Sequence, residues 1–165
     1  MGRPENEKPA ELYYDIQEAS KYESNTRIRF IQTMMTERCI ELLNLPAPAL
    51  LLDIGCGSAL SGEILTENGY MWEGIDISRD MLDLAASKQV EGGLMQYDMG
   101  DGFRFRAGTF DGAISVSALQ WLCVPPQKND NPFKRCCKFF QCLYECMVMG
   151  GRVVFQFYPE NKDQL

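Results

Sequence analysis

Apolar positions follow two different patterns along the chain, and their alternation predicts the fold class. Between residues 26 and 44 they recur at steps of three and four, which is typical of an amphipathic helix. Residues 49–54 form instead a continuous apolar run before a glycine turn, as in a strand buried on both faces. The two patterns then repeat. They predict strands at 49–54, 70–75, 94–97, 110–115 and 152–157, and helices at 26–44, 58–68, 78–88 and 133–147.

Strands separated by helices of about ten residues indicate an α/β fold with a parallel sheet. Residues 11–24 combine aromatic and charged side chains and predict a short helix or an irregular arm. A loop is expected at 125–132, and Gly150 with Gly151 is expected to turn the chain into the fifth strand. We therefore expect a mostly parallel sheet with helices on both faces, truncated after its fifth strand.

The composition limits the chemistry that the chain can perform. Its 165 residues carry a net charge of −7, seven cysteines and no histidine. Without histidine or a Cys-x-x-Cys pair we expect no metal site, and the commonest general base is missing. The polar N-terminus and the lack of an apolar run of about 20 residues predict an intracellular protein without a membrane segment. The thiols are therefore expected to be reduced.

The acidic charge also bears on the partners of the chain. Phosphate neutralisation dominates affinity for nucleic acids, so a net charge of −7 weakens the case for unaided nucleic-acid binding. It leaves open a nucleic acid that is held mainly by other parts of an assembly. Lys128, Lys134, Arg135 and Lys138 form the main basic cluster, which is interpreted either as a solvated helix face or as an RNA contact.

The strongest candidate site follows the first predicted strand, in the run from Leu51 to Gly57. A buried strand, then Asp-x-Gly-x-Gly, then a helix places backbone N–H groups against a ligand at the carboxyl edge of the sheet. Gly55 and Gly57 allow the tight turn and the close approach. A dinucleotide fingerprint needs a further glycine or alanine where this sequence has Leu60, so a pyrophosphate ligand is disfavoured.

Two further carboxylates follow the next predicted strands. Asp76 ends the second strand, from where an acidic residue accepts hydrogen bonds from ribose hydroxyls. Asp98 ends the third, where a carboxylate can accept a bond from an adenine amine. Together with the glycine loop they predict a site for an adenosine without phosphate. The alternative for both is an ordinary surface carboxylate, and Asp53 either orients the loop or touches the ligand.

With these features the sequence resembles the class I S-adenosylmethionine-dependent methyltransferases, and more specific stretches resemble the eukaryotic 18S rRNA (guanine-N7)-methyltransferases. The stretches are LLDIGCGS (51–58), LSGEIL (60–65), GIDIS (74–78), DMG (98–100), ISVSALQWL (114–122) and QFYP (156–159), with Arg3, Pro4, Glu5, Tyr22, Thr26 and Arg27. The resemblance covers essentially the whole chain. It implies a Rossmann-like fold, with an N-terminal helical arm at 1–48 and an S-adenosylmethionine-binding methyltransferase domain at 49–165.

In that family the enzyme methylates one guanine of 18S rRNA in the pre-40S particle, and it works as a heterodimer with a small zinc-binding activator protein. The resemblance implies the same partners, S-adenosylmethionine as cofactor, and a location in the nucleus (nucleolus and nucleoplasm) and cytoplasm. The family normally continues past this point with the last strands and a basic tail. An edge strand at 94–97 would suit strand addition by the activator, unless a loop covers it. Its flanking apolar residues are Leu94, Met95, Tyr97, Phe103 and Phe105.

The resemblance also implies roles for single residues. Guanine N7 carries a free lone pair and no proton, so the reaction needs positioning rather than a general base. The base is expected to be flipped or single-stranded, and Trp121 either stacks on it or belongs to the core. Arg27 either pairs with the methionyl carboxylate or is a solvated charge. The predicted catalytic residues are Ser117, Gln120, Trp121 and Tyr158, beside Pro159, and the predicted cofactor-binding residues are Arg27, Asp53, Gly55, Cys56, Gly57, Asp76, Ile77, Asp98, Met99 and Ser115.

Two alternative functions share this fold. A methyltransferase acting on a small molecule is favoured by the acidic charge. A non-catalytic assembly factor that binds S-adenosylmethionine would keep the cofactor site and use the protein as a scaffold.

Overall fold

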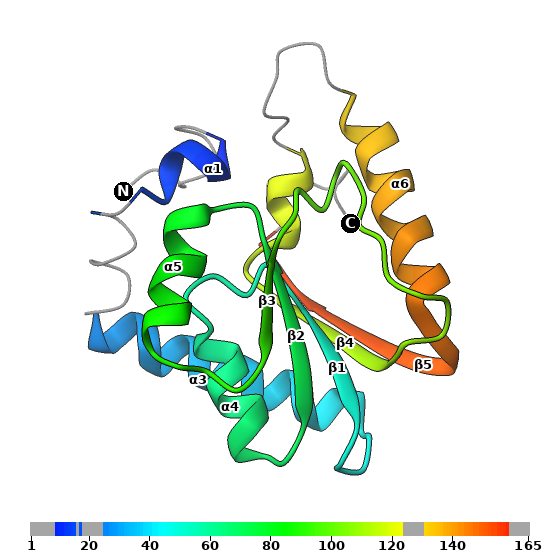
Figure 1. Cartoon of the computed structure of the whole chain (residues 1–165), viewed down its shortest axis with the longest axis horizontal. Coiled ribbons are helices and arrows are strands. Elements are labelled where there is room, and N and C mark those ends of the chain that lie inside the picture. The colour runs from blue at the N-terminus through cyan, green and yellow to red at the C-terminus, as the bar shows by residue number, and fades with distance from the viewer. Residues whose placement is uncertain (1–8, 16, 18–24, 124–130, 159–165) are drawn as a thin grey trace.

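The chain forms one parallel sheet with helices on both faces. A computed structural model describes residues 9–15, 17, 25–123 and 131–158. The five strands lie in the order β3-β2-β1-β4-β5, and every neighbouring pair is parallel (Figure 1). The predicted fold class is confirmed. The strands are β1 (Leu50–Ile54), β2 (Met71–Asp76), β3 (Gly93–Gln96), β4 (Phe110–Val116) and β5 (Met147–Gln156), and the helices are α1 (Ala10–Tyr13), α3 (Thr26–Leu43), α4 (Leu60–Glu67), α5 (Arg79–Ser87), η2 (Leu119–Cys123) and α6 (Pro132–Cys146).

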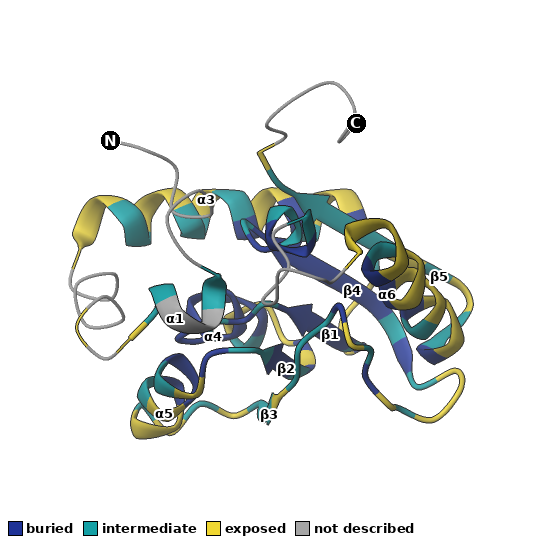
Figure 2. Cartoon of the chain, turned by 90° about the horizontal axis from the view of Figure 1, so that it is seen from above, coloured by how far each residue is buried: buried dark blue, intermediate teal, exposed yellow. Residues whose placement is uncertain are grey.

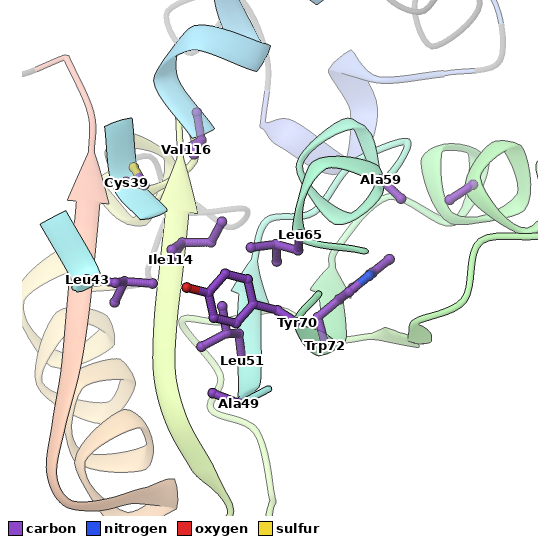
Figure 3. Close-up of a cluster of buried hydrophobic side chains, with 11 residues drawn as sticks. Cys39, Leu43, Ala49, Leu51, Ala59, Leu65, Tyr70, Trp72, Ile114 and Val116 are labelled. Carbon is purple, nitrogen blue, oxygen red and sulfur yellow. The ribbon is translucent and has the colours of Figure 1, made fainter. Parts of the chain in front are cut away.

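Successive side chains of the central strands point to opposite faces of the sheet and build two cores. Leu51 and Ile114 belong to the core that also receives side chains from α3, α4 and α5 (Figure 3). Their sequence neighbours Leu52 and Ala113 belong to the core that α6 covers on the other face. The central strands β1 and β4 are therefore mostly buried, whereas the edge strands β3 and β5 are mostly half-buried (Figure 2).

Local capping signals set the ends of the helices. The Asn25 side chain accepts hydrogen bonds from the N–H groups of Arg27 and Ile28 and starts α3. Ser78 caps α5 as predicted, because its Oγ accepts a bond from the Met81 N–H at 3.2 Å. The helix that follows the glycine loop, α4, begins at Leu60 rather than at the predicted residue 58. Ala59 has a left-handed conformation with φ of 64° and so cannot belong to the helix.

The fifth strand differs from its prediction. We expected a helix up to residue 147 and a turn at Gly150 and Gly151, but α6 ends at Cys146 and β5 runs directly from Met147. Phe110 pairs with Met147 and Gly112 with Arg152, so β5 carries the extra residues of a bulge. Gly150, with φ of 81°, lies in this bulge. The glycines therefore bend a strand instead of preceding one.

The N-terminal part of the chain is described in two pieces. The predicted arm contains one turn of helix, α1, while residues 16 and 18–24 lie outside the described residues. The predicted loop at 125–132 is likewise described only from residue 131 onward. Cys39 and Leu43 of α3 are buried in the core of the sheet, and the domain boundary at residue 48 stays a prediction. In the described part of the chain, no helix has the length and apolarity needed to cross a membrane.

Candidate active site

A cavity of about 500 Å³ opens at the carboxyl ends of the strands. This volume is in the range of small-molecule sites in proteins. Its wall combines the glycine loop after β1, the ends of β2, β3 and β4, one face of α3, and Pro9, Ala10 and Tyr14 from the N-terminal segment. Ligands of open α/β sheets bind at this edge. The topology therefore gathers turns that are distant in sequence around one ligand-sized space.

The glycine loop needs both of its glycines. Gly55 and Gly57 have φ of 74° and 53°, values that L side chains rarely adopt. A Cβ on Gly55 would lie 2.2 Å from the Cβ of Ala118, which follows β4. Between them lies Cys56, which lines the cavity, and burial raises the pKa of its thiol well above the usual range. The loop thus presents backbone and an uncharged thiol to the cavity.

Asp76, at the end of β2, ties the glycine loop to the start of α5. Its Oδ2 accepts the Gly57 N–H at 2.8 Å and its Oδ1 accepts the Ser78 N–H at 2.8 Å. Burial raises the pKa of Asp76, although hydrogen bonds from the N–H groups of Ser78, Gly57 and Ile77 favour the charged form. The two carboxylate oxygens have four lone pairs and receive three N–H donors, so one lone pair is left for a ligand hydroxyl.

Asp53 lies behind the loop and not in the cavity wall. Its side chain is buried, and its Oδ2 accepts a 2.6 Å hydrogen bond from Ser61 Oγ. Burial raises the pKa of Asp53 to about 7; the Ser61 hydroxyl opposes the shift and the charge of Asp76 adds to it. Ser61 does line the cavity. In this structure Asp53 contacts the cavity wall from behind, through Ser61 of α4, and its role at the loop stays a prediction.

Arg135 of α6 meets Asp98 at the end of β3. Two guanidinium nitrogens lie 2.8 and 3.1 Å from the two carboxylate oxygens, and both residues line the cavity. The expectation that Arg135 belongs to a solvated or RNA-binding basic face is wrong, because the side chain is buried and paired. Lys134 and Lys138 are exposed, and Lys128 lies outside the described residues.

Ser117 is the centre of a hydrogen-bond network on the other side of the cavity. It has a strained left-handed conformation, with φ of 58°. Its N–H and its hydroxyl both donate to Gln156 Oε1, at 3.0 and 2.8 Å, and Gln32 Nε2 approaches its Oγ at 3.4 Å. Gln120 Nε2 donates to the Ser117 carbonyl at 2.8 Å. The turn after β4 is thus held by side chains from α3, η2 and β5.

Trp121 lies at the same side of the cavity, under the N-terminal segment. Its ring is buried and lines the cavity. Ring centroids of Tyr13 and Tyr14 lie 6.0 and 5.9 Å from it, and the Tyr14 carbonyl accepts a hydrogen bond from Ser78 Oγ at 2.9 Å. Tyr158, half exposed, completes this side, with its hydroxyl 3.8 Å from the sulfur of Met35. An aromatic wall therefore faces the loop and carboxylates across the cavity.

The sequence comparisons agree with this architecture. The profile of the family described as "Methyltransferase domain" matches residues 52–155, well over half of the chain. The chain belongs to the methyltransferase-domain family. As a methyltransferase domain it has S-adenosylmethionine as its cofactor, and the cavity suits that molecule. The N–H groups of Gly55, Cys56 and Gly57 are bonded within the chain, to the Ile75 carbonyl and to Asp76, so the predicted free donors are absent from this part of the loop. The cavity wall offers instead close approach to the loop and the two strand-end carboxylates Asp76 and Asp98, and their contact with an adenosine stays a prediction.

Two curated relatives share about half of their aligned residues with the chain. The chain is 54% identical to the 18S rRNA (guanine-N(7))-methyltransferase of Mus musculus over 99% of its own length. It is 52% identical to the corresponding Arabidopsis thaliana protein over 96% of its length. The chain spans 59% and 56% of the length of these two relatives.

Solved structures share the fold at low sequence identity. An S-adenosyl-L-methionine-dependent methyltransferase of Methanococcus maripaludis superposes with a TM-score of 0.68 at 16% identity, over 91% of this chain and 67% of that one. A Haloferax volcanii structure, described as a complex of the Trm112 methyltransferase activator with a methyltransferase, gives a TM-score of 0.64 at 15% identity, over 84% of this chain and 59% of that one. These likenesses confirm the Rossmann-like methyltransferase fold.

Most residues predicted for the site of this methyltransferase domain meet at the cavity, and three do not. Arg27 is exposed near the start of α3, Asp53 lies behind the loop, and Ser115 is buried with its Oγ bonded to the Ile54 carbonyl. None of the three lines the cavity, so their contact with the cofactor stays a prediction. Pro159 lies outside the described residues. Cavity-lining predicted residues are Gly55, Cys56, Gly57, Asp76, Ile77, Asp98, Met99, Ser117, Gln120, Trp121 and Tyr158.

Sequence reasoning missed four residues of the cavity or its support. Gln156 ends β5 beside β4, so the strand-end argument used for Asp76 could have found it. Gln32, Tyr14 and Arg135 come from helices or from the N-terminal segment, and no motif marks them. Among the described residues, no group of three or more Cys, Asp or Glu side chains is arranged to hold a metal ion.

Proposed function

We propose that the protein methylates N7 of a guanine in 18S rRNA, using S-adenosylmethionine. Support comes from the two relatives named 18S rRNA (guanine-N(7))-methyltransferase, which are 54% and 52% identical to the chain. The chain spans less than two thirds of the length of each. The observation that carries the proposal is an unpartnered acceptor in the cavity wall. Within the described part of the chain, Gln120 Oε1 is buried without a hydrogen-bond donor, and Gln120 and Trp121 both line the cavity.

The amide of Gln120 is fixed in one orientation. Its Nε2 donates to the Ser117 carbonyl, which can only accept, so the other amide atom must be the oxygen. A buried acceptor without a donor costs free energy. Guanine carries N–H donors on its Watson–Crick edge and a flat face for stacking, so it can satisfy Gln120 and pack on Trp121 together. Adenine would present a different donor pattern at the same edge.

The residues of the glycine loop and the strand ends would hold the cofactor. Asp76 would accept bonds from the ribose hydroxyls and Asp98 from the adenine amine, while Gly55 and Gly57 let the backbone approach. When bound, S-adenosylmethionine supplies a methyl group on a positively charged sulfur. Because guanine N7 has a free lone pair, the chain needs no base and only has to hold N7 in line with that methyl group. This suits a protein without histidine.

A methylation assay on RNA fragments tests the proposed reaction. We expect transfer to an 18S rRNA fragment, and none when the target guanine is replaced by 7-deazaguanine, which lacks the N7 lone pair. Gln120→Met should lower kcat/KM by about tenfold to a hundredfold, because it removes the acceptor for the base. Gln141→Met changes an exposed glutamine of α6 and serves as the control. Equal transfer to 7-deazaguanine RNA, or transfer only to small molecules from a metabolite extract, would contradict the proposal.

We also propose that a small zinc-binding activator protein binds the free edge of β3. Within the described chain β3 pairs with β2 alone, so one of its sides offers unpaired backbone groups. Leu94 and Met95 pack on opposite faces of the sheet at this edge. One of the apolar residues predicted to flank the edge strand lies elsewhere. Phe103 is buried in the core under α6 and does not belong to the edge surface. A role in ribosome assembly would place the protein in the nucleus and cytoplasm.

Co-purification tests the activator interface. Leu94→Lys should abolish the heterodimer, because the lysine charge would be buried where the activator strand is proposed to pair with β3. Leu42→Lys, at an exposed position of α3, should leave it intact. Thermal unfolding of both variants shows whether the fold is kept. Heterodimer formation by a folded Leu94→Lys protein at the wild-type level would exclude β3 as the interface.

A further inference from the structure

Arg135 joins the cavity wall to the carboxylate at the end of β3. Its Nη2 lies 2.8 Å from Asp98 Oδ1 and its Nη1 lies 3.1 Å from Asp98 Oδ2, so the two groups meet fork to fork. Nη1 also lies 3.4 Å from Asp101. The side chain of Arg135 is 7% exposed. This bidentate geometry fixes the orientation of the Asp98 carboxylate more tightly than a single hydrogen bond would.

The segment after β3 is shaped around this guanidinium. A Cβ on Gly100 would lie 2.3 Å from the central carbon of the Arg135 guanidinium, so a larger residue there would displace the arginine. The Gly100 N–H also donates to Asp98 Oδ1 at 2.8 Å. Oδ1 thus receives two donors and Oδ2 one within the described chain, which leaves a lone pair on Oδ2 for a ligand.

One hydrogen of the guanidinium is unused. Within the described residues, Arg135 Nε is buried and has no acceptor, and Arg135 and Asp98 line the same cavity. Because the fork uses Nη1 and Nη2, Nε lies at the other end of the guanidinium from Asp98. This end of the cavity therefore offers a ligand one acceptor, the free lone pair of Asp98, whose direction the Arg135 fork fixes.

We propose that Arg135 is a positioning residue for the adenine of S-adenosylmethionine, and that the Arg135–Asp98 pair selects a 6-aminopurine over a 6-oxopurine. The exocyclic amine of adenine is a donor, which complements the free acceptor of the Asp98 carboxylate that Arg135 orients. In a 6-oxopurine a carbonyl oxygen replaces the amine and would face the carboxylate, acceptor against acceptor. The proposal concerns the cofactor end of the cavity and holds whichever molecule receives the methyl group.

Calorimetric titration with two product analogues tests the selection. S-adenosylhomocysteine and S-inosylhomocysteine differ only at C6 and N1 of the purine, where the amine becomes a carbonyl and N1 gains a proton, so the ratio of their Kd values reports on that edge of the base. We expect the wild type to prefer the adenosyl compound by at least about tenfold. In Arg135→Met its affinity should fall by about tenfold or more, and the ratio should shrink to within about threefold. Arg135→Lys keeps the charge without the fork and should give an intermediate ratio.

Arg152→Met is the matched control. Arg152 is an exposed arginine of β5 that donates to the Leu43 carbonyl at 3.2 Å and does not line the cavity. It should lose stability without any change in the ratio of the two Kd values. A wild type without preference, or an Arg135→Met protein in which both affinities fall equally, would overturn the proposal. If Arg135→Met does not fold, an unchanged ratio in Arg135→Lys has the same meaning.

Discussion

The two sides of the cavity are built in different ways. The side proposed for the cofactor is the glycine loop with Asp76, which are joined by backbone N–H groups and lie in consecutive strand–turn units. The side proposed for the substrate is centred on Ser117, whose side-chain partners come from α3, η2 and β5, which are far apart in the sequence. A turn made from backbone needs a fixed residue pattern, whereas a side-chain network can be assembled from any elements that meet. The glycine loop with Asp76 can therefore be recognised as a sequence motif, whereas the Ser117 network cannot.

The largest expected effect tests whether backbone geometry alone builds the cofactor side. Gly55→Ala combines a left-handed φ with a Cβ 2.2 Å from that of Ala118. We expect loss of S-adenosylhomocysteine binding and a fall of roughly 2–4 kcal/mol in the unfolding free energy, measured by calorimetry and chemical denaturation.

Gly108→Ala separates strain from collision. Gly108 has φ of 64°, but its Cβ would meet nothing within 4 Å. It should lose only roughly 1–2 kcal/mol of unfolding free energy and keep cofactor binding. Equal losses in the two alanine variants would show that collision with Ala118 has no part in the loop.

The second effect concerns the buried charge behind the loop. Burial raises the pKa of Asp53 to about 7, from an ordinary value of 3.8, so the folded chain keeps a proton that the unfolded chain releases. The stabilising contribution of Asp53 is thus complete below about pH 4 and is lost as the pH rises to about 7. Asp53→Asn should remove a decline on the order of 2–4 kcal/mol over that range.

Denaturation curves of wild type and Asp53→Asn between pH 4 and 8 give this difference directly. Asp83→Asn, at an exposed position of α5, is the control and should follow the wild type. If the wild type and Asp53→Asn show the same pH dependence, Asp53 titrates as an ordinary carboxylate in the folded chain.

The third effect is specific to the substrate side. Gln156→Leu removes the side-chain oxygen that accepts the Ser117 hydroxyl and shares the Ser117 N–H with the Gln156 backbone carbonyl, which remains. The turn after β4 should relax, and kcat/KM for RNA methylation should fall by about tenfold, equivalent to roughly 1–2 kcal/mol. The Kd for S-adenosylhomocysteine should change less than about twofold, because the cofactor side uses other groups. A parallel loss of cofactor binding would mean that the two sides are one network.

The smallest effect concerns the aromatic wall. Tyr14→Leu removes an edge contact to Trp121 but keeps the backbone carbonyl that Ser78 binds. We expect a loss of roughly 0.5–1.5 kcal/mol in RNA binding, measured as Kd. Tyr144→Leu, at an exposed position of α6, should have no effect on RNA binding. Unchanged RNA binding by Tyr14→Leu would show that Tyr14 has no part in holding the RNA base against Trp121.

The sequence predicted those parts of the fold and site that depend on local patterns. The parallel sheet followed from alternating strands and helices, and the cavity position followed from the glycine loop with Asp76 and Asp98. The start of β5 was missed because a bulge containing Gly150 is locally indistinguishable from a turn. Arg135 was misassigned because its helix also carries exposed lysines, and only the folded chain brings it to Asp98.

Trp121 gives the cavity a built-in optical reporter. The chain has two tryptophans, and the other, Trp72, is buried in the core with its Nε1 bonded to Thr66 at 2.9 Å. In a Trp72→Phe protein the emission would come from the cavity wall alone. Quenching or a wavelength shift on adding cofactor and then RNA would follow the two binding events separately, in real time and without a label. The same residue that is expected to recognise the base would thus record its arrival.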